Sequence, residues 1–183
     1  MIINRKNILK YAEAYDQGYR CTDGEKVEVK MKLLLKRQRF LKKKELVEIG
    51  KWKSKRPVKH YRSEENDDLT VKEITKFSFN TESERARIKS LLALKGISWP
   101  VASSILHFAF PEKYPIMDFR VVWSLGWNQP SSHNFSFWQK YCTRISRLSK
   151  RYRLPIKNSG KSTLEIFKIS PGKIKQGLTH SEG

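Results

Sequence analysis

The amino-acid sequence predicts a mainly α-helical domain arranged as a two-lobed helical bundle. Its 183 residues suit a single domain, and hydrophobic residues, at 38% of the chain, are sufficient for a core. Three stretches, residues 22–25, 70–73 and 81–84, have the capping-box pattern of Thr followed three residues later by Glu. Towards the C-terminus, apolar residues recur at helical spacing and predict a core-facing stripe: Phe137, Trp138, Tyr141, Cys142, Ile145, Leu148 and Tyr152.

The N-terminal part of the chain is expected to form three helices. The first covers about residues 7–15, and the second covers about residues 22–40. The second segment also admits a strand, because apolar and polar residues alternate from Val27 to Leu35. The capping box and the long basic continuation favour the helix. The third helix is expected over residues 43–53.

A basic segment interleaved with aromatic residues, residues 51–62, precedes an acidic stretch, residues 63–68, which we interpret as a linker. The following helix is expected to take Thr70 as its N-cap, with Leu69 and Ile74 as a hydrophobic staple. The next helix is expected to begin at the third capping box, with Thr81 as its N-cap, and its apolar face contains Ile88, Leu91 and Leu92.

Gly96 lies where two helices must reverse direction within a few residues. Glycine permits the left-handed backbone that such a turn requires, and Ile97 can then enter the core between the helices. Pro100 suits the first turn of the second helix, residues 100–110, where its missing N–H costs nothing. The free N–H groups of that turn and the helix dipole can bind a phosphate oxygen. An ordinary corner between two helices is the alternative interpretation.

Asp118 begins the next expected helix, which ends near Leu125. Aspartate is a favoured N-cap, so capping alone would account for it. A carboxylate at a helix start also tends to stay ionised, and its charge would stabilise the cationic sugar that forms when an N-glycosidic bond breaks. The same group can orient or deprotonate the attacking water. Beyond this helix we expect a loop over residues 126–134, a helix over residues 164–169 and a flexible tail over residues 171–183.

The chain carries a formal net charge of +20 and has a pI of about 10.1. This charge favours nucleic acid as the partner, with an anionic membrane surface as the second choice. No apolar run is long enough to span a bilayer, and residues 1–10 are too polar for a signal peptide. We therefore expect a protein that is cytoplasmic and nucleoid-associated, or otherwise intracellular. Cys21 and Cys142 cannot form a metal site by themselves, and we expect no metal or cofactor, unless a monovalent cation binds at the hairpin.

The hairpin, Leu94–Ala102, and the element Pro115–Asp118 together resemble the helix-hairpin-helix (HhH-GPD) superfamily of DNA glycosylases, over roughly residues 82–126. That superfamily shares a hairpin, a Gly/Pro-rich loop and then an aspartate. The match is closest to the adenine and thymine-mismatch glycosylases, where Pro-Ile-Leu-Asp stands in place of Pro-Ile-Met-Asp here. The resemblance implies one HhH-GPD-like domain over residues 1–170, with Asp118 as the catalytic residue. It implies hydrolysis of the N-glycosidic bond of a flipped damaged, mismatched or modified base, which leaves an abasic site.

Several departures from the family pattern bear on this chemistry. Bifunctional members attack the sugar with a lysine near the start of the second hairpin helix. Pro100 stands at that position here, so we expect a monofunctional enzyme without Schiff-base lyase chemistry. Lys95 stands at the usual proline position and Ser98 replaces the usual second glycine. Two cysteines cannot supply the four-cysteine iron–sulfur cluster of several relatives.

By this resemblance the protein is a monomer that binds double-stranded DNA. The residues expected to contact DNA are Lys95, Gly96, Ile97, Ser98 and Trp99 in the hairpin, Lys51, Lys53, Lys55 and Arg56 in the basic segment, and Arg120, which could instead brace Asp118. Candidates for stacking on the flipped base are Trp99, Trp52, Trp123 and Trp127.

Two other function classes compete with the enzyme. The first is a non-catalytic helix-hairpin-helix DNA-binding protein, in which Asp118 is only a cap. The second, which has no motif to support it, is a protein that binds RNA or an anionic membrane. Within the glycosylase hypothesis the base remains open: it is a repair lesion or a modified base of phage DNA, and the latter would make the protein a defence enzyme.

Overall fold

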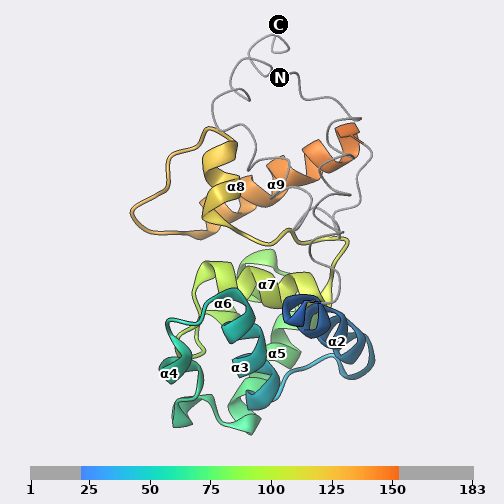
Figure 1. Cartoon of the computed structure of the whole chain (residues 1–183), viewed down its shortest axis with the longest axis vertical. Coiled ribbons are helices and arrows are strands. Elements are labelled where there is room, and N and C mark those ends of the chain that lie inside the picture. The colour runs from blue at the N-terminus through green and yellow to red at the C-terminus, as the bar shows by residue number, and fades with distance from the viewer. Residues whose placement is uncertain (1–21, 153–183) are drawn as a thin grey trace, which may run out of the picture. The chain divides into compact units, whose positions relative to one another are not determined.

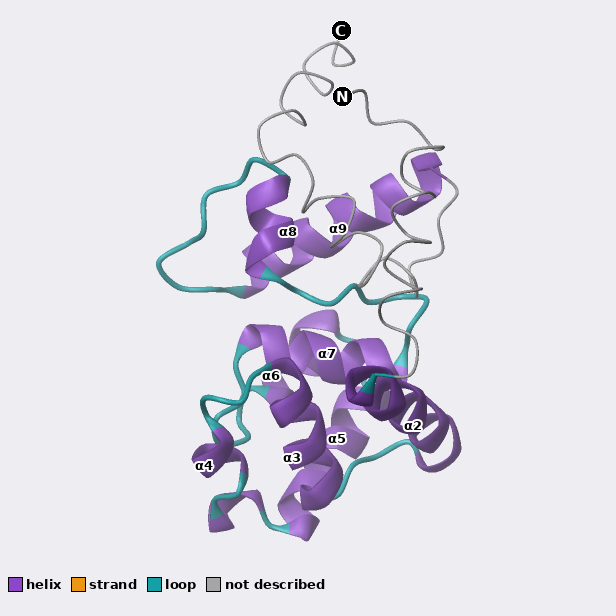
Figure 2. Cartoon of the chain, in the orientation of Figure 1, coloured by secondary structure: helices purple, strands orange, loops and turns teal. Residues whose placement is uncertain are grey.

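The computed structural model describes residues 22–152 and divides the chain into two compact units, each of which is described by itself (Figure 1). The glycine-turn unit comprises residues 21–114, and the aspartate unit comprises residues 1–20 and 115–183. Over residues 22–152 the regular elements are helices and no strand occurs (Figure 2), which confirms the mainly α class. The helices expected over residues 7–15 and 164–169, and the tail from residue 171, lie outside the described residues.

The glycine-turn unit is built around one buried helix. Its described elements are α2 (Asp23–Gln38), α3 (Lys43–Lys53), α4 (Val58–Tyr61), the 3₁₀ helix η1 (Glu64–Asn66), α5 (Asp68–Asn80), α6 (Glu84–Leu91) and α7 (Trp99–Ala109). Every residue of α7 from Val101 to Phe108 is buried, and α2, α3 and α6 all pack against this helix. A helix that is apolar all round in this way belongs inside a core. Pro100 lies in its first turn, as predicted.

Helix α2 settles the choice between helix and strand. The Thr22 hydroxyl accepts a hydrogen bond from the Glu25 backbone N–H at 3.2 Å and caps the helix as predicted. A strand would turn all the alternating apolar residues to one face. Instead, Met31 and Leu35 are buried whereas Val29 and Leu33 are exposed, which is the separation that a helical period produces.

The predicted starts of α5 and α6 are wrong by a few residues. Helix α5 takes Asp67 as its N-cap, because the Asp67 carboxylate accepts the Thr70 backbone N–H at 2.7 Å, and this bond is the main cause of the lowered pKa of Asp67. An ionised acceptor binds a backbone N–H more strongly than a hydroxyl does. Leu69 is consequently exposed and forms no staple with Ile74. Helix α6 takes Ser83 as its N-cap, whereas Thr81 lies at the C-cap of α5.

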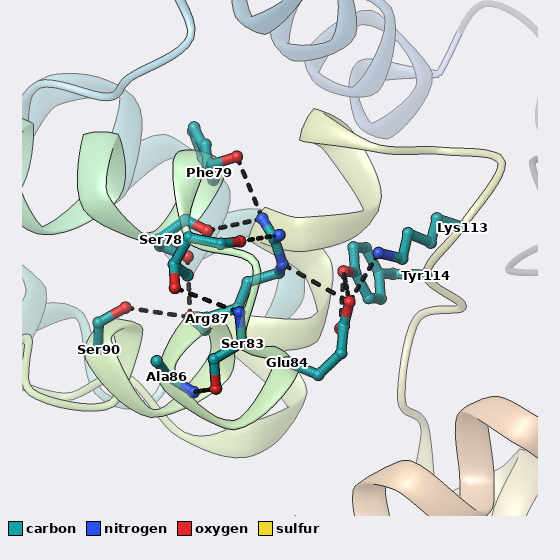
Figure 3. A network of polar contacts seen from close by, with 10 residues as sticks. Ser78, Phe79, Ser83, Glu84, Ala86, Arg87, Ser90, Lys113 and Tyr114 are labelled. Carbon is teal, nitrogen blue, oxygen red and sulfur yellow. Dashed lines mark hydrogen bonds and ion pairs between the residues drawn. The ribbon is translucent and has the colours of Figure 1, made fainter.

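Arg87 ties the end of α5 to the start of α6 (Figure 3). Its buried guanidinium donates hydrogen bonds to three backbone carbonyls, those of Ser78 (2.8 Å), Phe79 (3.1 Å) and Thr81. Glu84 forms an ion pair with Arg87 at 3.9 Å and accepts hydrogen bonds from Lys113 (2.6 Å) and the Tyr114 hydroxyl (2.8 Å). The network therefore fixes the helix that leads into the glycine turn.

The aspartate unit contains α8 (Phe119–Ser124) and α9 (Phe135–Tyr152) among its described residues, joined by the expected loop over residues 126–134. The Asn134 side chain accepts the Phe137 backbone N–H at 2.9 Å and so begins α9. Trp138, Tyr141 and Ile145 are buried, which confirms the predicted core stripe at these positions. None of the helices over residues 22–152 is long and apolar enough to cross a membrane.

Candidate functional site

The connection between α6 and α7 makes the predicted left-handed turn. Gly96 has φ 81°, a conformation that side chains disfavour. Ile97 is buried, as predicted, and its backbone N–H donates to the Leu94 carbonyl at 3.1 Å. The backbone N–H groups of Gly96 and Ser98 have no acceptor among the described residues. The turn therefore offers two donors at the start of α7.

Asn66 holds the turn in place from the segment that we interpreted as a linker. Its side-chain oxygen accepts the Lys95 backbone N–H at 2.8 Å, and its NH₂ group lies 3.1 Å from the Lys95 carbonyl. The same NH₂ group lies 3.1 Å from the carbonyls of His60 and Tyr61. Asn66 is completely buried, so these bonds satisfy a polar group that would otherwise be costly. The stretch over residues 63–68 is therefore a structural clamp and not a linker.

Tyr61 packs between two glycines and brings the basic segment to the turn. A Cβ on Gly50 of α3 would lie 2.6 Å from the Tyr61 ring, and a Cβ on Gly96 would lie 2.6 Å from the His60 Cβ. Side chains at either glycine would therefore push α4 away. Burial is the main cause of the raised pKa of the Tyr61 phenol. The end of the basic segment, at His60 and Tyr61, thus lies against the hairpin although the two are far apart in sequence.

Of the cations predicted to contact DNA, four belong to the basic segment and one, Arg120, belongs to the other unit. Lys51, Lys55 and Arg56 are exposed and Lys53 is half-buried. The same segment adds Lys59 and Arg62, both exposed, which the sequence reasoning did not single out individually. In the hairpin, the Lys95 ammonium forms an ion pair with Glu65 at 3.0 Å, with both side chains largely exposed. A phosphate at the turn would compete with Glu65 for this ammonium.

Two of the tryptophans considered for base stacking, Trp99 and Trp52, make contacts within the glycine-turn unit, where Trp52 is half-buried. Trp99 is buried, with the Lys89 ammonium 5.4 Å from its ring centre. The indole N–H of Trp52 donates to the Gly24 carbonyl at 3.0 Å, and its ring meets Phe108 edge-on at 5.0 Å. Ser98, by contrast, is exposed at the N-cap of α7, and its hydroxyl makes no capping bond. The hairpin thus exposes the polar Ser98, whereas Trp99 belongs to the core.

Asp118 is the N-cap of α8, as predicted. Its carboxylate accepts the Arg120 backbone N–H at 2.9 Å, and the residue is only 9% exposed. Asp118 is also the single acidic residue between Pro115 and Tyr152. The carboxylate is therefore fixed in position, shielded from water, and surrounded in sequence by neutral and basic residues.

Tyr141 of α9 fastens the segment that carries Asp118. Its hydroxyl donates to the Ile116 carbonyl at 2.8 Å. Burial raises the pKa of this phenol well above its ordinary value, and the nearby charges of Cys142 and Asp118 add to the effect. A hydrogen bond with the Asp118 backbone opposes the rise. The sequence placed Tyr141 in the core stripe correctly, but nothing in the stripe pattern indicated that it contacts the Asp118 segment.

The outer face of α8 carries aromatic side chains. Phe119 and Trp123 are 62% and 56% exposed, and the Arg120 guanidinium lies 4.9 Å from the centre of the Phe119 ring. The Arg120 side chain thus contacts Phe119, while the Arg120 backbone N–H donates the capping hydrogen bond to Asp118. Trp127 is half-buried and meets Phe137 edge-on at 6.0 Å.

The glycine turn and Asp118 belong to different compact units, and the boundary between Tyr114 and Pro115 separates them. Residues 22–152 contain no group of three or more His, Cys, Asp or Glu side chains that could hold a metal ion. Comparisons with protein-family models, with curated proteins and with solved structures found no significant match to this chain. Its function must therefore be argued from its own residues.

Proposed function

We propose that this protein is a monofunctional DNA glycosylase that hydrolyses the N-glycosidic bond of a flipped base. The pair α6–α7, with Gly96 between them, would be the helix-hairpin-helix element of the resemblance, and Asp118 would be the catalytic residue. The observation that carries the proposal is the state of Asp118: a carboxylate 9% exposed, fixed by a backbone N–H, and the single acid between Pro115 and Tyr152. We expect the protein to act as an intracellular monomer on double-stranded DNA.

The chemistry needs one negative charge and one water. As the base leaves, the sugar becomes cationic, and a carboxylate fixed beside it stabilises that charge without rearranging. Asp118 would also orient the water that attacks the sugar or accept its proton. The buried position strengthens both effects, because a low local dielectric weakens electrostatic screening. Pro100 has no amine, so we expect hydrolysis without a Schiff base and without strand cleavage.

DNA binding would use the glycine turn together with the basic segment. The Gly96 and Ser98 N–H groups would meet phosphate oxygens, and the exposed cations Lys55 and Arg56 would meet further phosphates along the strand. Such contacts fix the register of DNA without reading its sequence. The rigidity that Asn66 and Tyr61 give to this surface favours this use, because preorganised donors lose little entropy on binding.

A second function is favoured by the capping bond itself. The hydrogen bond from the Arg120 backbone N–H to Asp118 accounts for an aspartate at this position without any catalysis. The protein would then be a non-catalytic helix-hairpin-helix DNA-binding protein. Both functions predict steep salt dependence of binding, and only the first predicts release of a base.

The variant Asp118→Asn separates the two functions. Asparagine caps a helix about as well as aspartate but carries no charge. We expect purified wild-type protein to produce alkali-labile abasic sites in DNA with damaged or modified bases, and the variant to lose this activity while it still binds the same DNA. Asp67→Asn is the matched control, because Asp67 caps α5 in the other unit. Undiminished excision by Asp118→Asn, or no release from any substrate, would contradict the assignment.

The substrate is best sought with whole genomic DNAs that differ in base modification. Repair lesions would give abasic sites in alkylated, oxidised or deaminated DNA. Modified phage bases would give them in phage DNA and not in the unmodified host DNA. Counting abasic sites after each incubation distinguishes repair from defence.

A further inference from the structure

Helix α8 exposes two aromatic rings on one face. Phe119 and Trp123 are four residues apart, so their side chains lie on the same side of the helix. They are 62% and 56% exposed. Large aromatic side chains bury most of their surface in a folded protein, and a pair left in water on one helix face marks an interaction site.

Cations lie directly against the aromatic residues of this unit. The Arg120 guanidinium is 4.9 Å from the centre of the Phe119 ring, and the Lys140 ammonium is 4.8 Å from the centre of the Trp127 ring. The Gln129 side chain donates to the Phe119 carbonyl at 3.1 Å, so the loop that carries Trp127 returns to the first residue of α8. A cation therefore lies against an aromatic ring at two positions of this unit, one of which is the exposed Phe119.

The charge of residues 115–152 indicates the kind of partner that this unit binds. Between Pro115 and Tyr152 the single acidic residue is Asp118, which is largely buried, whereas the basic residues are Arg120, Lys140, Arg144, Arg147, Lys150 and Arg151. A partner that matches this surface must offer flat rings to stack on and negative charges next to them. A nucleic acid strand with unpaired bases has both, whereas an apolar protein surface would leave the cations without counter-charges.

We propose that Phe119 and Trp123 form a stacking surface for unpaired DNA bases. The rings would take the π-faces of bases in a single strand or in an opened duplex, and the neighbouring cations would take the phosphates. The proposal shares its ligand with the proposed glycosylase but does not rest on catalysis by Asp118. Of the tryptophans considered for base stacking, the proposal keeps Trp123, and it adds Phe119. In the other unit, Trp99 is buried, and Trp52 is half-buried with its indole N–H bonded to the Gly24 carbonyl.

Three DNA ligands of equal length separate stacking from charge: oligo(dT), a duplex, and a strand of stable abasic-site analogues. The abasic strand keeps the phosphates of oligo(dT) and lacks the bases. Each base that stacks on one aromatic ring is expected to contribute about tenfold. With two rings, we therefore expect the wild-type protein to bind oligo(dT) about a hundredfold more tightly than the abasic strand. Stable analogues also keep the measurement independent of base excision.

The variants Phe119→Ala and Trp123→Ala are each expected to weaken binding of oligo(dT) about tenfold, with binding of the abasic strand unchanged. Phe119→Tyr and Trp123→Phe keep a ring and should restore most of the affinity, which guards against loss of folding. Phe77→Ala is the matched control, because Phe77 is 54% exposed on α5 in the other unit. It should change neither affinity.

Two results would overturn the proposal. One is that the alanine variants bind all three ligands as the wild type does, or lose affinity for the abasic strand as much as for oligo(dT). The other is that the wild-type protein self-associates through this face, seen as a dimer by analytical ultracentrifugation that the alanine variants convert to monomer. If Asp118→Asn abolishes excision while oligo(dT) binding persists, the glycosylase and the stacking surface are both supported. If no base is released from any DNA, the stacking surface is still judged by the three ligands alone.

Discussion

Glu65 forms an ion pair with the Lys95 ammonium, which a DNA phosphate would have to displace. The two groups lie 3.0 Å apart, and both are exposed, so their ion pair contributes little to stability. Glu65→Gln should leave folding unchanged and raise the affinity for duplex DNA at low salt by about two- to fivefold, the equivalent of up to about 1 kcal/mol. Fluorescence anisotropy at low and high salt would measure this gain, which screening should abolish at high salt.

Glu73→Gln provides the control for this change, because Glu73 is exposed on α5 and its loss alters the net charge equally. An equal gain from both variants would mean that only the overall charge matters and that Lys95 has no particular contact with DNA.

Tyr141 links the stability of the aspartate unit to alkaline pH. Burial is the main cause of its raised pKa, which lies well above the ordinary value of 10.0. The folded state therefore holds a proton that the unfolded state releases, so the stabilisation is complete below pH 10 and declines as the pH rises towards the folded-state pKa. Thermal unfolding between pH 7 and pH 11 should show this decline in the wild type and a weaker one in Tyr141→Phe.

At pH 7 the same substitution should lower the free energy of unfolding by about 1 kcal/mol, because the hydrogen bond to the Ile116 carbonyl is lost. An identical alkaline decline in both proteins would show that Tyr141 titrates freely in the folded state.

At the scale of whole elements, periodicity identified the helices better than it identified their ends. Residues 43–53 form a helix with the expected bounds, and its buried face contains Leu46, Ile49 and Gly50. The starts of α5 and α6 were misplaced because several Ser, Thr and Asp residues stand near each start. The sequence pattern identifies several residues that could act as the N-cap. The tertiary structure determines which of them accepts a hydrogen bond from the free backbone N–H groups.

The clamp at η1 could not be predicted from local patterns. Asn66 lies in an acidic stretch whose composition is typical of a loop, yet it is completely buried and bonded to Lys95, 29 positions further along the chain. The same holds for the meeting of Gly50 and Gly96 across Tyr61. Such contacts between distant segments leave no period in the sequence. The turn itself could be predicted because Gly96 and Pro100 act locally.

The η1–hairpin junction predicts a large effect for one substitution. Asn66→Ala removes the acceptor for the Lys95 N–H and the donor that faces the carbonyls of residues 60, 61 and 95. Groups left buried without partners should lower the free energy of unfolding by about 2–3 kcal/mol. Urea denaturation would measure this loss. Asn80→Ala serves as the control, because Asn80 makes a single exposed hydrogen bond to the Lys76 carbonyl. This variant should lower the free energy of unfolding by well under half as much as Asn66→Ala does.

At the scale of the whole molecule, the charge of +20 predicted an anionic partner but not where it binds. Helix α4 brings His60 against Gly96, and the exposed Lys59 precedes His60 in the same helix. The described residues of the aspartate unit, residues 115–152, include six basic residues and one acidic residue. The described residues therefore carry cations near each of the two proposed DNA contacts.

The salt dependence of DNA binding tests whether the basic segment contacts phosphates. Each phosphate that a cation neutralises releases counterions and contributes about 0.9 to the slope of log K against log salt concentration. The triple variant Lys55→Ala, Arg56→Ala, Lys59→Ala should therefore lower the slope for duplex DNA by about 2–3. The control variant Lys36→Ala, Arg37→Ala, Lys44→Ala removes the same charge from exposed positions of α2 and α3. Because counterion release counts contacts and not net charge, the control should keep the wild-type slope, and equal slopes for the two triple variants would place the contacts elsewhere.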